Sequence, residues 1–225
     1  MSYAVDSDYW GFRDTNCEVQ SSSRDPQPSE AQCEDSNGDV AASTMYDTVT
    51  AQSVVYQRCA DGIVKFYDTT TGIDFRPGKV IGGYVITSIA LGTNNKERPT
   101  ITISGRSCPS ADSAVNKYNP EDLHIATERK AVGIGVTPDT VSKLLSSSGT
   151  VAVQVAVVPD SDGNTACLDV YGGRVDASNE LAGCTGDPGA TVDTGWTTSG
   201  GPSDDQENTG YAGGTIGVFK NLAQM

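Results

Sequence analysis

The chain has 225 residues, of which 29 are acidic and 15 are lysine or arginine, so its formal net charge is −14 at pH 7. Lys and Arg are needed to neutralise phosphates, and this balance therefore excludes a protein that coats DNA or RNA. Aromatic residues are only 7% of the chain and glycines number 25, which predicts short strands, long polar loops and a thin core that a neighbouring subunit would complete.

Residues 1–16 are predicted to form an extended N-terminal arm. They hold an unusual share of the aromatic residues without a clean period, namely Tyr3, Tyr9, Trp10 and Phe12. Such a surface is expected to pack either on its own body or on another subunit. The same stretch has neither the basic region nor the apolar core of a signal peptide, and the longest apolar run, Val151 to Val158, is strand-sized. Synthesis in a cytosol, with no membrane partner, is the expectation.

The cysteines are predicted to be reduced thiols. There are six of them, Cys17, Cys33, Cys59, Cys108, Cys167 and Cys184. In a reducing compartment such residues are more often small buried groups than disulfide partners. None lies in a CxxC pair and the chain has one histidine, so we expect neither a zinc site nor any other metal or cofactor.

The first half is predicted to be a β domain over residues 17–105. Cys17 to Ser23 is a strand candidate, and the prolines that follow predict a polar loop over residues 24–28. Asn37-Gly38 predicts a type I′ hairpin, in which both central residues have positive φ. The return strand, residues 40–58, is expected to be interrupted near Asp47.

The rest of that half is predicted to be a second hairpin. Residues 78–91 are rich in β-branched residues and contain Gly82-Gly83, which predicts one bent strand. A polar tip over residues 92–99 then leads to residues 100–104, whose strict alternation buries Ile101 and Ile103 on one face. Residues 106–131 are predicted to be a linker, in which Asn119-Pro120-Glu121-Asp122 resembles a helix start.

The second half, residues 132–225, is predicted to be another β domain that opens with a helix. Thr137 as N-cap, Pro138 at the first helical position and Gly149 as a stop predict a short helix between them. The strands that follow are expected at residues 150–158, 165–171 and 214–219, with a hairpin turn at Asp162-Gly163 and a long polar loop over residues 195–210.

An internal repeat relates the two halves. Residues 35–59 and 160–184, compared at an offset of 125 without a gap, match at Asp35/Asp160, Ser36/Ser161, Gly38/Gly163, Ala41/Ala166, Tyr46/Tyr171, Ser53/Ser178 and Cys59/Cys184. The alternative is a coincidence between two hairpins of the Asx-Gly kind. The repeat favours two tandem, similar β-barrel or β-sandwich domains with one or two short helices.

No motif predicts an enzyme. The acids and amides around Asp35 and Asp160 are spaced unlike an EF-hand, because glycine comes too early, and are interpreted as hairpin turns. His124 has no nearby serine or cysteine motif, and Gly133-Ile134-Gly135 lacks the third glycine of a dinucleotide-binding loop. Paired carboxylates of a glycosidase remain open among 29 acids, although such sites usually recruit aromatic platforms.

The succession of an acidic Asx-Gly hairpin, a strand of the type Val-Ile-Thr-Ser-Ile-Ala, a polar tip and a closing Thr-Ile-Thr-Ile-Ser strand resembles structural proteins of tailed bacteriophages, above all tail-tube-like proteins. The resemblance covers residues 33–105 best and residues 150–219 more loosely. It implies a virion protein, assembled in the host bacterial cytoplasm, whose subunits pair through β edges into a ring or tube. Its partners would be itself, other virion proteins and DNA that passes through without specific binding.

A binding module is the alternative function. In that case the polar tips at residues 93–97 and 200–210 would recognise a ligand, as in a receptor-binding or adhesin protein. A carboxylate-based hydrolase is the third hypothesis.

Overall fold

The computed structural model describes residues 18–57, 63–65, 76–107, 118, 124–126, 131–140, 142–183, 190–200 and 212–223. Within these ranges every regular element is a β-strand, so the prediction of a mainly β protein is confirmed. The strands are β1 (Glu18–Glu34), β2 (Val40–Gln57), β3 (Ile63–Lys65), β4 (Val80–Ile81), β5 (Tyr84–Asn94), β6 (Thr100–Ser107), β7 (His124–Ala126), β8 (Val136–Pro138), β9 (Ser142–Pro159), β10 (Thr165–Gly183), β11 (Ala190–Val192), β12 (Thr197–Gly200) and β13 (Ala212–Asn221).

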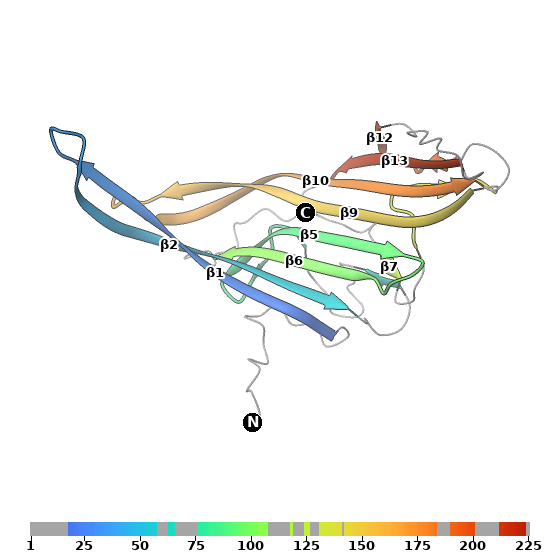
Figure 1. Ribbon diagram of the computed structural model, residues 1–225, viewed down its shortest axis with the longest axis horizontal. Coiled ribbons are helices and arrows are strands. Elements are labelled where there is room, and N and C mark those ends of the chain that lie inside the picture. The colour runs from blue at the N-terminus through green and yellow to red at the C-terminus, as the bar shows by residue number, and fades with distance from the viewer. Residues whose placement is uncertain are drawn as a thin grey trace, which may run out of the picture.

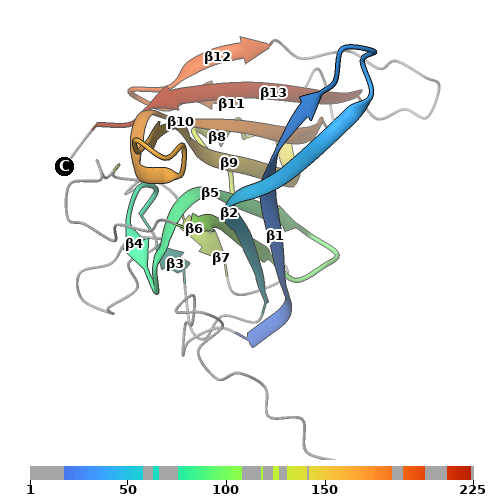
Figure 2. The ribbon, with the colours of Figure 1, turned by 90° about the vertical axis from the view of Figure 1, so that its left-hand side faces the viewer.

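One open sheet of nine strands dominates the molecule (Figure 1). Its strands follow the order β1-β2-β6-β5-β9-β10-β13-β12, and the short β4 adds to β5. Figure 2 shows β12 at the top of the stack, while β1 and β2 run from its lower part up to the level of β12. Two small sheets, β8 with β11 and β3 with β7, accompany it. Strands from both halves of the sequence therefore belong to one hydrogen-bonded surface, and β5 meets β9 where the halves join.

Two long hairpins, β1–β2 and β9–β10, extend from the same end of the molecule (Figure 1). The two turns lie at the predicted residues, but the turn type differs from the predicted type I′. In the first turn Gly38 N donates to Asp35 O at 3.1 Å, and only Gly38 is then needed in the left-handed region, with φ of 85°. This pattern is typical of a three-residue loop, in which glycine follows a type I turn.

Two consecutive residues with positive φ, which were expected at Asn37-Gly38, occur instead at Gly82-Gly83. Gly82 and Gly83 have φ of 58° and 83°, and Ile81 pairs directly with Tyr84. Two glycines in the left-handed region form the tight hairpin between β4 and β5. The prediction of one bent strand over residues 78–91 is therefore wrong, because the paired glycine reverses the chain.

The predicted helix after Thr137 is also wrong. Pro138 ends β8, a turn closes with Ser142 N donating to Asp139 O at 3.1 Å, and β9 starts at Ser142. Gly149 lies inside β9, where a Cβ would be 2.8 Å from the Ile134 side chain. The cap-like residues fit a turn equally well, and pairing of β9 on both sides outweighs a weak helix propensity.

Three further predictions are corrected in part. Residues 24–28 are not a loop but the middle of β1, where proline is tolerated because the strand is at the sheet edge. The interruption near Asp47 is a register shift in a continuous strand, since Tyr46 pairs with Ser29 and Thr48 with Pro28. Residues 197–200 of the predicted long loop form β12. The helix start at residues 119–122 lies outside the described residues.

The main sheet consists of two groups of four strands with the same order. In the first group the hairpin β1–β2 is followed by β6 and then β5, and in the second the hairpin β9–β10 is followed by β13 and then β12. The closing strand of each group thus pairs with the second strand of its hairpin. Residues 100–104 and 214–219, each predicted to be a strand, lie in β6 and β13 and have the same position in this order.

The two groups also share their register irregularities. In β1–β2 the register shifts between Cys33 and Glu34, and the second hairpin shifts between Val158 and Pro159, which are the residues 125 positions later. Two other shifts correspond at the same offset: Val19/Ser21 with Leu144/Ser146, and the shift after Tyr46 with that after Tyr171. A fourth shift, Ile86/Ser88 in β5, has its counterpart at Thr198/Gly200 in β12, which lies 112 positions later. These positions are independent of the sequence matches that defined the offset.

The same alternate residues are buried in corresponding strands of the two groups. Thr50, Gln52, Val54 and Tyr56 are buried in β2, and the residues 125 positions later in β10 are Val175, Ala177, Asn179 and Leu181, which are also buried. Ile101 and Ile103 of β6 are buried on one face as predicted, and Ile216 of β13, the counterpart of Ile103, is also buried. A shift of one residue in strand register would turn every side chain to the other face of the sheet. The two groups therefore direct equivalent positions toward the core.

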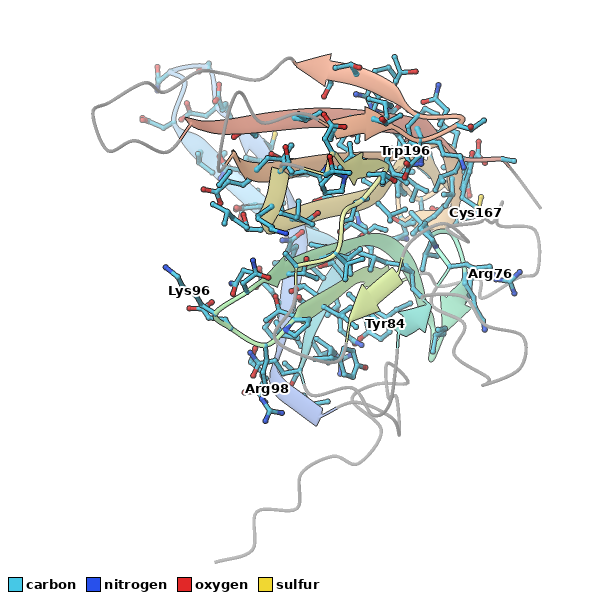
Figure 3. The ribbon with its side chains drawn as sticks, turned by 90° about the vertical axis from the view of Figure 1, so that its right-hand side faces the viewer. Arg76, Tyr84, Lys96, Arg98, Cys167 and Trp196 are labelled. Carbon is cyan, nitrogen blue, oxygen red and sulfur yellow. The ribbon has the colours of Figure 1, made fainter. Side chains whose placement is uncertain are left out.

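One large apolar cluster spans both groups. It includes Ile89 and Val151 at the β5–β9 junction and Ile134 and Val136 from the segment that leads into β9. Trp196 packs against this cluster, and Figure 3 shows it in the part of the molecule formed by the second group, with Tyr84 in the first. The ring of Trp196 lies over Gly135, so that a Cβ there would be 2.3 Å from the ring.

We predict that Gly135→Ala lowers the free energy of unfolding by about 3 kcal/mol, because it combines a left-handed backbone with overpacking against Trp196. Chemical denaturation measures the loss. Gly83→Ala is the matched control, since Gly83 also has positive φ but open space around it, and should cost about 1 kcal/mol. Equal losses in the two variants would contradict the packing of Trp196 on Gly135.

Candidate interaction edges and the junction between strand groups

The two hairpin tips use their first aspartate to hold the turn. Asp35 Oδ1 accepts hydrogen bonds from Asn37 N at 2.8 Å and Asp39 N at 3.0 Å. Asp160 Oδ1 accepts from Asp162 N and Asn164 N, both at 2.9 Å. The carboxylates are therefore engaged with the backbone, and the described residues contain no cluster of three possible metal ligands. This geometry supports the interpretation as turns.

We predict that adding calcium leaves the thermal unfolding midpoint unchanged, because Oδ1 of Asp35 and of Asp160 already accepts the backbone hydrogen bonds that hold the turns. Asp160→Ala should lower stability by about 1 kcal/mol through loss of those hydrogen bonds, with or without calcium. Differential scanning calorimetry with calcium and with a chelator tests both. A calcium-dependent rise that Asp160→Ala abolishes would contradict this assignment.

The other residues singled out in the sequence do not converge on a reaction centre. His124 begins β7, and its side chain is outside the described part of the chain. Gly133 and Gly135 belong to the segment before β9 and lie against Val136 and Trp196 rather than in a phosphate-binding turn. The predicted arm, residues 1–16, and residues 201–210 of the long loop are also outside it.

The polar tip between β5 and β6 is fastened to the body at its base. Asn95 N donates to Leu145 O at 3.2 Å, and Asn95 Nδ2 donates to Leu144 O at 2.7 Å. The same side chain accepts from Ala131 N at 3.0 Å. Figure 3 shows Lys96 projecting at the outer end of this tip. The tip is therefore an ordered turn that ties three segments together.

The junction between β5 and β9 is a continuous antiparallel ladder from Ser88↔Ala152 to Asn94↔Ser146. The hydrogen bond from Asn95 N to Leu145 O continues this ladder by one residue. Because hydrogen-bonded and non-hydrogen-bonded pairs alternate in an antiparallel ladder, the hydrogen-bonded pairs are those of odd-numbered residues, such as Thr93↔Ser147. Ser88↔Ala152 is consequently a non-hydrogen-bonded pair. The hydroxyl of Thr93 also donates to Ser147 O at 3.4 Å.

The segment before β9 crosses this junction and is bound on both sides. Val132 N donates to Thr93 Oγ1 of β5 at 3.2 Å. On the other side the fully buried amide of Asn179 accepts from Ile134 N and donates to Ile134 O, both at 3.0 Å. Ser147 Oγ of β9 donates to Asn179 Oδ1 at 2.8 Å. Asn179 therefore satisfies a backbone that the core would otherwise leave unpaired.

Two strands end the sheet. Among the described residues β1 pairs only with β2, and β12 pairs only with β13. An edge strand exposes unpaired N–H and C=O groups that can accept another strand. Residues 21–28 of β1 are exposed. The edge of β1 is the longer of the two, and these two edges are the main candidates for an interaction surface.

No protein-family model matches the chain, and no curated protein matches it in sequence. Among the described residues there is no helix of the length and apolar character required to cross a membrane.

We predict that Asn179→Val lowers the free energy of unfolding by about 3 kcal/mol. This holds even though the first strand group has a valine, Val54, at the position equivalent to 179. The reason is that the N–H and C=O of Ile134 lose their partner while buried. Ser147→Ala, which removes one hydrogen bond to the same amide, should cost about 1 kcal/mol. Urea denaturation of both variants gives the comparison, and a neutral Asn179→Val would contradict the anchoring role.

Proposed function

We propose that the protein is a structural virion protein of a tailed bacteriophage, tail-tube-like, whose subunits associate through β edges into a ring or tube that conducts DNA. The observation that supports this best is the sheet itself: it joins two equivalent strand groups edge to edge and leaves one edge of each kind open. A sheet built in this way extends naturally by adding a further copy. Edge pairing around a closed ring would also remove exposed edges.

We further propose that the two strand groups are tandem copies of one β unit. The shared strand order and the four corresponding register shifts support this. Outside the matched residues used to set the offset, Ser21-Ser22-Ser23 also recurs as Ser146-Ser147-Ser148. With two units per chain, three subunits would present six units around a ring.

The charge of the hairpins agrees with a DNA conduit. Residues 25–57 and 150–173 contain several aspartates and glutamates but no lysine or arginine. Both hairpins extend from one end of the molecule (Figure 1), so the charges that they place there are all negative. A channel lined by such a surface would neutralise no phosphate and would let DNA pass without sticking.

The binding-module alternative gains less support. Its first recognition loop, residues 93–97, is the tip that Asn95 fastens to β9 and to the segment before it. An adaptable recognition loop would not need its central amide to hold the fold together. Its second loop, beyond Gly200, lies outside the described residues.

We predict that the purified full-length protein forms rings or short tubes in negative-stain images and sediments as a closed oligomer. The expected reason is that unpaired edges and a thin core are completed by neighbours. Analytical ultracentrifugation across a concentration series accompanies the images. A protein that stays monomeric at the highest concentration would overturn the proposal.

A further inference from the structure

We propose that Asn37 is a self-modification site, where the tip of the β1–β2 hairpin converts its asparagine to aspartate or isoaspartate each time the turn opens and reacts. Asn37-Gly38 is the one Asn-Gly pair in the sequence. Glycine has no side chain to hinder attack by its own amide nitrogen, so asparagine before glycine is especially reactive. Both residues are exposed at the end of a hairpin that extends from the body of the molecule (Figure 1). The modification does not require self-assembly.

The reaction needs no other reactant than water. The backbone nitrogen of Gly38 loses its proton and bonds to Cγ of Asn37, the C–N bond of the side-chain amide breaks, and ammonia leaves behind a five-membered succinimide. Water then opens this ring in one of two ways. Cleavage between the nitrogen and Cγ leaves aspartate. Cleavage between the nitrogen and the backbone carbonyl carbon leaves isoaspartate, in which the main chain runs through the side chain and is one carbon longer.

The turn itself controls the reacting nitrogen. In the closed turn Gly38 N donates to Asp35 O at 3.1 Å, so this N–H is directed into the turn. Asp35 Oδ1 accepts from Asn37 N at 2.8 Å and from Asp39 N at 3.0 Å, which holds the backbone on both sides of the pair. Attack on Cγ requires the nitrogen to be released from its acceptor. The rate is therefore that of an unstructured Asn-Gly pair multiplied by the fraction of time that the tip is open.

The end of the hairpin can open without disturbing the core. Residues 30–44 are all exposed, and β2 pairs with β6 only from Ala51 onward. A Cβ placed on Gly38 would have nothing within 4 Å, so the succinimide ring has room at the tip. Local opening costs little free energy where no buried apolar contact is lost. The reaction at Asn37 is therefore compatible with a folded body.

The second hairpin shows that the aspartyl product fits this turn. Its tip has Asp162-Gly163 where the first has Asn37-Gly38. Gly163 N donates to Asp160 O at 3.2 Å, and Gly163 has the same φ of 85° as Gly38. Conversion of Asn37 to aspartate thus gives the first tip the Asp-Gly pair that the second already has. Residues 25–57 contain no lysine or arginine, so the new carboxylate adds to a charge that nothing in the hairpin offsets.

Peptide mapping by mass spectrometry tests the proposal. The full-length protein is kept folded in a mildly alkaline buffer, beside the same protein unfolded in guanidinium chloride, and conversion of Asn37 is followed over time. The folded chain should convert about tenfold more slowly than the unfolded one, because the turn must open first. Asn164 of the second tip precedes a threonine and is the internal control, which should stay intact. An unconverted Asn37 after a period about a hundredfold longer than the unfolded chain needs would overturn the proposal, as would equal rates in the two states.

Matched variants of the two tips test the control by the turn. Asp35→Ala removes the Oδ1 acceptor of the first tip and should speed the conversion of Asn37 about fivefold in the folded protein. Asp160→Ala removes the equivalent acceptor from the second tip and should leave that rate unchanged. Asp35→Asn keeps a side-chain carbonyl as acceptor, should give an intermediate rate, and replaces the alanine variant if that one does not fold. An Asp35 variant that converts at the wild-type rate, or an equal acceleration by Asp160→Ala, would overturn the role of the turn.

The fit of the product is tested separately. Asn37→Asp should unfold at the same thermal midpoint as the wild type, because the second tip has an aspartate at this position with the same backbone hydrogen bonds. A clearly lower midpoint would overturn the equivalence of the two tips as the basis for an accommodated product.

Discussion

The antiparallel ladder between β5 and β9 is the contact on which the rest of the structure depends. Each four-stranded group has a hairpin and a closing pair, but neither encloses its apolar residues alone. Pairing β5 with β9 makes Ile89 and Val151 neighbours and extends one apolar cluster across both groups. The segment before β9 then covers this line and is bound by Thr93 on one side and Asn179 on the other. A thin core is thereby shared between the two groups.

The equivalence of the groups explains which surfaces remain open. A unit that pairs its last strand with the first strand of the next unit has two complementary edges, and joining two units consumes one edge of each kind. Among the described residues, β1 and β12 are the strands that end the main sheet. Departures from the repeat are local: Pro26 stands where the second group has Val151, and Val54 where it has Asn179. Pro26 lies in an edge strand, where a missing N–H is tolerated. Asn179 lies under the segment before β9 and binds its backbone, whereas Val54 has no such role to fill.

The hairpins show how local chemistry and charge act together. An aspartate at the start of each tip accepts two backbone N–H groups, and a glycine in the left-handed region completes the reversal. These bonds are local and need no tertiary support, which suits hairpins that extend beyond the body of the molecule. Their acids have no lysine or arginine nearby in sequence to offset them. Such tips repel a polyanion.

Local residues by themselves determined the β class, both hairpin tips and the burial of Ile101 and Ile103, because turn chemistry and two-residue alternation act over a few positions. They misassigned residues 137–149, since cap-like residues also suit a turn and only pairing of β9 with β5 and β10 makes that segment a strand. They also misassigned residues 24–28, because whether proline is tolerated depends on which strand is at the edge. The β12 edge and the hydrogen bonds from Asn179 to the segment before β9 had no signal in the sequence. Strand order decides them, and strand order is set by contacts between residues far apart in the chain.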